Sequence, residues 1–273
     1  MRLATFNVLH GRSPTDGLVD LPRLREAVSG LDADVLGLQE VDRGQPRSAG
    51  HDLVAEAAAA MGGQGRFAPA IVGTPGERWR PARDGDDRGD EPAYGIGLVS
   101  RLPVRRWAVT RLPSAPVRSP VPVPGPTRRV IWLRDEPRVL LAAVLDTPAG
   151  PLTVATTHLS FVPGWNGLQL RRAARALRQL PGPWVLLGDL NLPGPLPRWL
   201  IGWRTLAALP TYPVDEPRLQ LDHILGHGDG LPPVAATRAL PTPLSDHRAL
   251  VVDLAGGDSR AEDGGAAARE PAG

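Results

Sequence analysis

The chain has 273 residues, of which 42% are hydrophobic and 22% charged, and its formal net charge is +2. This balance excludes wholesale disorder, a collagen-like chain and a coiled coil, and the length suits one large domain or two small ones. The sequence has no cysteine, which excludes disulfides, a thiolate nucleophile and cysteine-ligated zinc or iron–sulfur clusters. A metal ion would need oxygen or imidazole ligands, a requirement that suits Mg²⁺, Mn²⁺ or Ca²⁺.

The 31 basic residues are all arginines. By itself this composition does not indicate a nucleic-acid partner, which would require a clustered basic face. The N-terminal segment lacks the pattern of a signal peptide, and the longest apolar run, near residues 139–145, is too short to span a bilayer. We expect a cytoplasmic protein without a membrane span, and a monomer.

Strand-like runs dominate the chain, and three helical patterns interrupt them. Asp20 caps the first predicted helix, which ends at Gly30; the second covers residues 51–61 and the third residues 167–180. The predicted strands cover residues 2–8, 34–39, 94–100, 104–110, 128–134, 138–146, 151–158, 184–187, 219–225, 234–240 and 249–254.

The segments between these elements predict a single domain. Residues 73–93 are rich in Arg and Asp, residues 113–127 are rich in Pro, and both are predicted surface loops. Residues 255–273 form a low-complexity tail that we expect to be disordered. No linker divides residues 1–254, so we expect one α/β domain, and the succession of strand after strand argues against a βα barrel.

Eight polar side chains share one feature, because each lies at or near the end of an apolar strand. They are Asn7, Glu40, His158, Asp189, Asn191, Asp222, Asp246 and His247. Side chains at strand ends can converge at one edge of a sheet, where carboxylates can bind a hard cation and an imidazole can act as a general base. Each residue alone also fits a structural role, such as a turn for Asn7, a satisfied core histidine for His158 or a strand-end cap for Asp246.

Seven short motifs follow one another along the chain: TFNV at 5–8, LQEV at 38–41, YGIGLVSR at 94–101, THL at 157–159, GDLN at 188–191, LDHI at 221–224 and SDH at 245–247. The ordered set resembles the motifs of the endonuclease/exonuclease/phosphatase (DNase I-like) superfamily, from Met1 to about Leu254. The resemblance implies a four-layer αββα sandwich that hydrolyses a phosphoester with Mg²⁺ or Mn²⁺ as its cofactor.

The same resemblance implies a metal site and a water-activating residue. Glu40 resembles the main metal ligand, with Asn7 beside it and Asp246 at the metal site or directly behind it. Asp189 resembles the residue that orients or deprotonates the attacking water, and Asn191 the residue that hydrogen-bonds the phosphate. These roles are chemically consistent, because a divalent ion neutralises charge on an anionic ester while a positioned carboxylate activates water.

Two histidines complete the implied site. His247 resembles the catalytic histidine that polarises the phosphoryl group or acts as a base. Asp222 would orient it, as a buried carboxylate fixes an imidazole tautomer. His158 matches the additional histidine of the DNase I and neutral sphingomyelinase branches, where it faces the scissile phosphate, and argues against the abasic-site endonuclease branch.

The substrate stays open among nucleic acid, a phospholipid head group and a small phosphoester, as does the choice between a phosphodiester and a phosphomonoester. Arg43 and Arg47 are candidates for binding the substrate phosphate, although they fit a solvated loop equally well. Aromatic residues make up 4% of the chain and offer few platforms for stacking bases. The alternative function is a catalytically silent binding or scaffold protein on the same fold, which the eight intact polar residues disfavour. A serine hydrolase is set aside because the sequence has no Gly-x-Ser-x-Gly motif.

Overall fold

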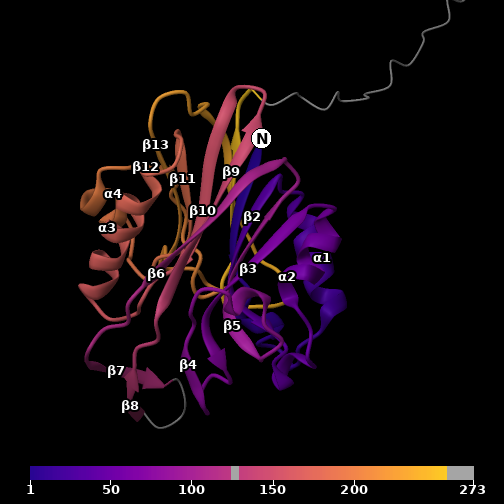
Figure 1. Ribbon diagram of the computed structural model, residues 1–273, viewed down its shortest axis with the longest axis vertical. Helices are drawn as coiled ribbons and strands as arrows, with labels where there is room; N and C mark the ends of the chain where they lie inside the picture. The colour runs from indigo at the N-terminus through magenta and orange to yellow at the C-terminus, as the bar shows by residue number, and fades with distance from the viewer. Residues whose placement is uncertain (124–128, 257–273) are drawn as a thin grey trace, which may run out of the picture.

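Two β-sheets pack face to face and carry helices on both outer faces in the computed structural model, which describes residues 1–123 and 129–256 (Figure 1). The first sheet has seven strands in the order β14-β15-β1-β2-β5-β3-β4, and the second has six in the order β12-β13-β11-β10-β9-β6. The layers are therefore helix, sheet, sheet and helix, which confirms the predicted αββα sandwich in a single α/β domain.

The strands of the two sheets alternate in blocks along the chain. The first sheet contains β1 (Arg2–Asn7), β2 (Val35–Arg43), β3 (Gln64–Gly73), β4 (Trp79–Pro81), β5 (Ala93–Ser100), β14 (Val234–Leu240) and β15 (Ala249–Leu254). The second contains β6 (Val104–Leu112), β9 (Arg138–Thr147), β10 (Gly150–His158), β11 (Trp184–Asp189), β12 (Arg204–Ala207) and β13 (Asp222–His227). A separate hairpin pairs β7 (Arg118–Val123) with β8 (Arg129–Arg134).

Helices cover the outer face of each sheet. On the first sheet lie α1 (Leu21–Leu31) and α2 (Leu53–Met61), and on the second lie α3 (Trp165–Leu177) and α4 (Leu196–Ile201) (Figure 1). Three short 3₁₀ helices complete the list: η1 (Leu9–Gly11), η2 (Pro46–Ser48) and η3 (Asp86–Arg88). Among the residues that the structure describes, no helix has both the length and the apolar character to cross a bilayer.

Strand β2 shows why the central strands read as continuous apolar runs. Leu36 and Leu38 pack beneath α1 and α2, whereas Val35 packs in the core between the two sheets. Both faces of the strand are therefore buried, and alternation between apolar and polar residues disappears. At Gly37 the sheets approach so closely that an added Cβ would lie 2.7 Å from Oγ1 of Thr156 on the opposing sheet.

The first two helices start close to the predicted residues, because aspartate side chains cap their N-termini. The Asp20 side chain accepts a hydrogen bond from the backbone N–H of Arg23, and Asp52 accepts two such bonds at the start of α2. Helix α1 continues past the predicted end at Gly30, because Asp32 instead takes the left-handed conformation that ends the helix. Helix α3 begins at Trp165 and ends at Leu177, so the predicted range 167–180 is shifted towards the C-terminus.

Several elements were missed or misplaced in the sequence-based prediction. Strands β3 and β12 and helix α4 were not predicted, and the predicted loops 73–93 and 113–127 contain β4 and β7. Strand β7 includes Pro120 and Pro122, which are tolerated because it pairs with a single neighbour. Strand β13 starts at Asp222, three residues after the predicted start. The start of the predicted strand 128–134 at Arg128 and most of the predicted disordered tail, residues 257–273, lie outside the described residues.

Replacing Gly37 with alanine tests the close approach of the sheets. The added methyl group would meet Thr156 and Leu187, so we expect G37A to lower the free energy of unfolding by about 1–3 kcal/mol. The matched control is G30A, since Gly30 lies in α1 with no heavy atom near its added Cβ. That variant should be neutral or more stable by about 0.5–1 kcal/mol. Chemical denaturation of both variants measures the difference, and equal stabilities would contradict the tight contact.

Candidate active site

Six strands from two sheets bring the predicted site residues to one end of the sandwich. In the first sheet Asn7 ends β1, Glu40 lies in β2, and Asp246 and His247 precede β15. In the second sheet His158 ends β10, Asp189 ends β11, and Asp222 begins β13. Strands β1 and β2 are parallel, as are β10 and β11, so within each pair the carboxyl ends lie at the same edge. The site is therefore assembled from two separate sheets.

The Asn7 side chain joins the two halves. Its Nδ2 donates to Oε1 of Glu40 at 3.0 Å and to Oδ2 of Asp189 at 3.1 Å. Its Oδ1 accepts a hydrogen bond from the backbone N–H of Leu9. In this orientation the amide nitrogen, not the oxygen predicted to bind metal, faces the two carboxylates. Asn7 thus acts here as a bridge between Glu40 and Asp189.

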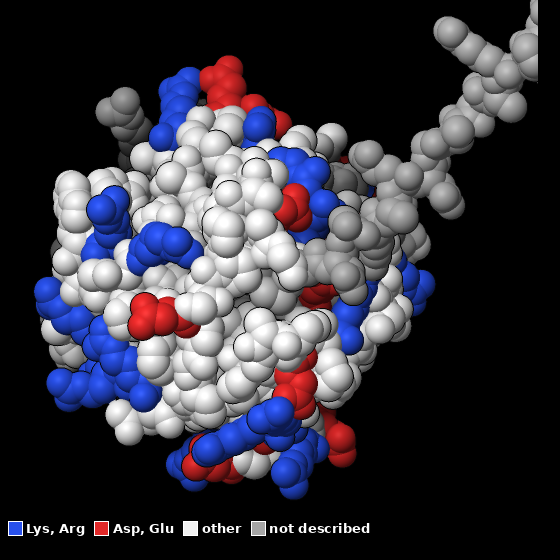
Figure 2. Space-filling model, turned by 90° about the horizontal axis from the view of Figure 1, so that it is seen from above, with Lys and Arg blue, Asp and Glu red and all other residues white. Residues whose placement is uncertain are grey.

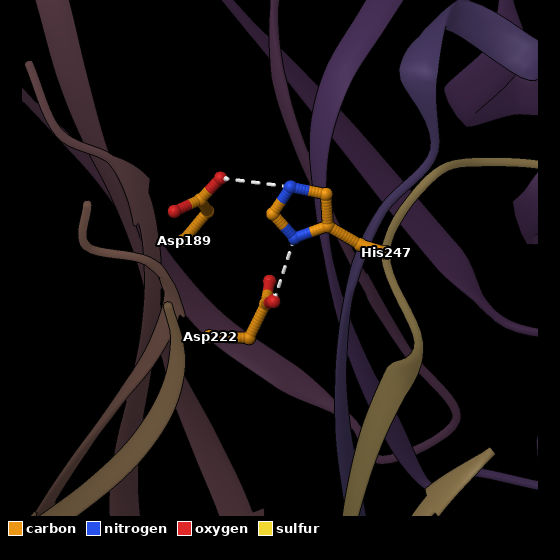
Figure 3. Close-up of side chains that lie close together, drawn as sticks. All are labelled: Asp189, Asp222 and His247. Carbon is orange, nitrogen blue, oxygen red and sulfur yellow. Dashed lines mark hydrogen bonds and ion pairs between the residues drawn. The ribbon is translucent and has the colours of Figure 1, made fainter. Parts of the chain in front are cut away.

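The His247 ring lies between two aspartates, both from the second sheet (Figure 3). Its Nδ1 is 2.8 Å from Oδ2 of Asp222, and its Nε2 is 3.8 Å from Oδ2 of Asp189. Burial by itself lowers the pKa of this ring. The charge and hydrogen bond of Asp222 outweigh burial, and together with the charge of Asp189 they raise the pKa to about 10. The ring is therefore an imidazolium at neutral pH, with a proton on each nitrogen.

Asp189 is the most connected carboxylate of the site. In addition to the hydrogen bond from Asn7, it accepts one from the backbone N–H of Asn191 at 3.0 Å. Its Oδ2 also lies 3.5 Å from Nε2 of His158. Burial is the main cause that raises the pKa of this carboxyl to about 7, against the opposing charge of His247. A carboxylate with a pKa near neutrality can accept a proton from water and release it again.

His158 and Asn191 lie beside Asp189. The Asn191 amide nitrogen donates to the carbonyl of Leu159 at 3.0 Å and is 3.2 Å from Nε2 of His158. Burial, followed by the charge of Arg138, lowers the pKa of His158 well below its usual value. His158 is therefore neutral, in contrast to His247.

Glu40 and Asp246 occupy the other side of the site. Burial raises the pKa of Glu40, and the charge of Asp246 raises it further. The Asp246 backbone carbonyl accepts from the N–H of Val214 at 2.7 Å. The charge of Asp246 therefore acts on Glu40, as expected of two carboxylates at one site.

Three residues of the site have a backbone conformation that side chains seldom adopt. The φ angle is +55° at Glu40, +49° at Asn191 and +70° at Ser245, directly before Asp246. Hydrogen bonds hold the last of these, because the Ser245 hydroxyl donates to the carbonyl of Asn7 and accepts from the N–H of His247. Such conformations persist where the surrounding structure fixes them, and they cluster at functional sites.

The two arginines predicted to bind phosphate have internal partners. Arg43 donates to the backbone carbonyls of Asp86 and Asp87 in η3. Arg47 makes two hydrogen bonds to the buried carboxylate of Asp42, at 2.7 and 2.8 Å. Among the described residues, neither forms a hydrogen bond or ion pair with another predicted site residue. Their role in substrate binding therefore stays a prediction.

Sequence reasoning missed two residues that border the site. Arg138 is 7% exposed and begins β9, and it lines a small cavity of about 10 Å³ together with Tyr94 and His158. The ring of Tyr212 packs on that of His247, with centroids 4.9 Å apart. An arginine directly before the apolar run 139–145 was the available signal for Arg138, whereas the sequence around Tyr212 carries no comparable signal.

His223 fixes the loop that follows Asp189. Because the carbonyl of Leu192 can only accept, Nε2 of His223 must carry the proton in their 2.7 Å hydrogen bond. Nδ1 is then left to accept from the side-chain amide of Gln220 at 3.2 Å. Only an unprotonated Nδ1 can accept from Gln220, and burial lowers the pKa of the ring to about 4.

Three side chains of the site are close enough to share a cation, although His247 would have to lose a proton to bind it. One ligand atom from each of Asp189, Asp222 and His247 lies within 4.8 Å of the others. Oδ1 of Asp222 is buried without a hydrogen-bond partner among the described residues. This group differs from the predicted metal ligands Asn7, Glu40 and Asp246, although the Asn7 bridge makes the two groups neighbours.

Comparisons with known proteins agree on one fold. A model of the Endonuclease/Exonuclease/phosphatase family matches residues 4–247, and no curated protein matches the sequence. An endonuclease/exonuclease/phosphatase from Beutenbergia cavernae DSM 12333 is 22% identical with a TM-score of 0.64, covering 93% of this chain and 71% of that one. A mannosyl-6-phosphatase from Bacteroides thetaiotaomicron VPI-5482 is 16% identical with a TM-score of 0.60, covering 93% and 99%. D. rerio TDP2 complexed with single strand DNA product is 18% identical with a TM-score of 0.58, covering 92% and 97%.

The His223 contacts predict a dependence of stability on pH. The unfolded chain takes up a proton at the ordinary histidine pKa of about 6.5, whereas the folded protein resists it down to about 4. Stability from this residue is therefore complete above pH 6.5 and is lost as the pH falls towards 4, by up to about 3 kcal/mol. Chemical denaturation between pH 4 and 6.5 measures the free energy of unfolding of the parent and of H223Q, and we expect that of the variant to depend less on pH. Parallel curves would contradict the assignment.

Proposed function

The chain belongs to the endonuclease/exonuclease/phosphatase family, and from that membership we propose that it is a divalent-metal-dependent phosphoester hydrolase in which an activated water attacks phosphorus. One observation carries the proposal: Asn7 joins Glu40 to Asp189 across the two sheets, beside the His247–Asp222 pair. We propose Glu40 as the metal-binding carboxylate, Asp189 as the proton acceptor and His247 as the cationic donor, and the contacts that join them support these roles.

We propose Mg²⁺ or Mn²⁺ as the ion, held by Glu40 with Asp246 and Asn7. The donor set suits a hard cation because all three side chains offer oxygen. Burial and mutual repulsion raise the pKa of Glu40, and a cation would relieve both effects. For Asn7 to bind through oxygen, its amide would have to turn from the orientation described above. A bound ion would supply charge neutralisation at the phosphoryl oxygens.

The chain's own groups supply the proton transfers. Oδ2 of Asp189 accepts a proton from the attacking water, while the backbone N–H of Asn191 fixes the carboxylate through Oδ1. The Nδ1–H of His247 donates a hydrogen bond to Asp222, and its Nε2–H donates one to a phosphoryl oxygen. The amide of Asn191 and the neutral ring of His158 border the same position and are suited to bind the phosphate.

The proposal includes phosphomonoesters and phosphodiesters, and among diesters both nucleic acid and lipid head groups. The structural neighbours include a mannosyl-6-phosphatase and a protein complexed with single strand DNA product, so the shared fold does not distinguish these substrates. Arg138 adds a buried positive charge next to His158, which favours an anionic group at this position.

Hydrolysis of bis-p-nitrophenyl phosphate and p-nitrophenyl phosphate tests the proposed activity. Turnover should require Mg²⁺ or Mn²⁺ and stop with EDTA. E40A should lower the affinity for the activating metal at least about 10-fold. H247A should lower kcat by about 10²–10⁴-fold with little change in metal affinity. Exposed residues of the same types provide the matched controls E26A and H51A, which should retain activity. No turnover with either ion would favour the catalytically silent binding protein.

Replacing Asp222 with asparagine tests the imidazolium. D222N removes the main charge that raises the pKa of His247, so the ring should lose its proton at lower pH. We expect kcat to fall by about 10²–10⁴-fold, and the loss of activity on the alkaline side to begin at lower pH than in the parent. The measurement is kcat from pH 6 to 10, and an unchanged alkaline limb would contradict the role of His247.

A further inference from the structure

Helices α3 and α4 on the second sheet, with its edge strand β12, carry exposed charge of one sign. Residues 159–214 contain a single acidic residue, Asp189, which is buried in the site. The same segment contains six exposed arginines, Arg171, Arg172, Arg175, Arg178, Arg198 and Arg204. These six residues, together with Leu168 and Trp199, are here called the basic face. The chain as a whole has a net charge of only +2, so this concentration is a property of the face.

The arginines of the basic face have no internal partners. Over residues 1–123 and 129–256, none of the six guanidinium groups forms a hydrogen bond or an ion pair. Other arginines of the chain are paired, as Arg25 is with Glu56 and Arg101 with Asp32. Figure 2 shows blue side chains gathered along the left margin, the side on which Figure 1 places α3 and α4, with little red among them. Their charge is therefore free to act on a partner.

Two large apolar side chains are exposed in the same layer. The exposed fraction is 70% for Trp199 and 47% for Leu168. A Cβ added at Gly167 would lie 3.3 Å from Leu200, so α3 and α4 meet beside both residues. Leu168 shares one stripe of α3 with Arg171, Arg172 and Arg175, at the i, i+3, i+4 and i+7 positions of a helix.

We propose that the basic face docks the protein on an anionic phospholipid bilayer. An arginine at a bilayer surface can bury its apolar stem while its guanidinium group stays among the phosphates. Arginines next to an exposed Trp and Leu are typical of a helix that lies in the membrane interface. Trp prefers the boundary between head groups and acyl chains. A nucleic acid would use the arginines equally well, but it gives no reason for Leu168 to be exposed between them.

Docking would also set the orientation of the enzyme. Helix α3 begins next to the active site, where the side chain of Asn166 donates to the carbonyl of Asn191 at 2.8 Å. The membrane would therefore lie against the flank of the sandwich, with the site opening beside it. Docking does not depend on the proposed hydrolysis, and the two can fail separately.

Sedimentation with vesicles tests the inference without any measurement of activity. The full chain should bind vesicles of phosphatidylcholine mixed with phosphatidylserine, bind pure phosphatidylcholine weakly, and dissociate as salt is raised. Loss of three charges in R171Q/R172Q/R175Q should weaken binding by about 100-fold. W199A should weaken it several-fold without a change in charge.

The matched control removes the same charge elsewhere. Arg78, Arg83 and Arg88 are exposed and lie in the mixed-charge segment 73–93, and their guanidinium groups form no hydrogen bond or ion pair among the described residues. R78Q/R83Q/R88Q should therefore bind vesicles like the parent. Thermal unfolding of each variant confirms folding. Equal losses in both triple variants, or no binding by the parent, would overturn the proposal. Binding of a DNA duplex that depends on Arg171, Arg172 and Arg175, without vesicle binding, would assign the face to nucleic acid instead.

Discussion

The active site depends on hydrogen bonds that cross from one sheet to the other. Asn7 from the first sheet reaches Asp189 of the second, and His247 from the first reaches Asp222 of the second. Neither sheet alone holds both Glu40, the proposed metal-binding carboxylate, and the complete His247–Asp222 pair. A small change in the separation of the sheets would break both contacts, because hydrogen bonds weaken steeply with distance.

Packing behind the site fixes that separation. The buried amide of Gln39, adjacent to Glu40, donates to the hydroxyl of Thr5 in its own sheet and to that of Thr156 across the interface. Gly37 lets the backbone of β2 approach Thr156 closely. A buried polar contact of this kind costs energy unless it is satisfied, so it favours one registration of the two sheets over others. The core thus determines how accurately the site is assembled.

Burial gives the similar groups of the site different properties. His247, between Asp222 and Asp189, is cationic, whereas His158, beside Arg138, is neutral. Burial likewise raises the pKa of Asp189, which turns an ordinary acidic side chain into a group able to exchange a proton near neutral pH. The two histidines therefore differ in charge because of their surroundings, although they are the same residue type.

Motif order and buried strand runs, which are local features of the chain, were enough to predict the family resemblance and, through it, the sandwich and eight candidate site residues. It did not determine where Arg43, Arg138 or Tyr212 would lie, since a side chain's partners depend on segments distant in sequence. Strand β3 escaped prediction and β7 was taken for a loop, because pairing with a neighbour overrides weak local preference. Two features follow from packing and could not be read from local sequence: Asn7 bridges two carboxylates, and the six arginines of the basic face lie exposed without internal partners among the described residues.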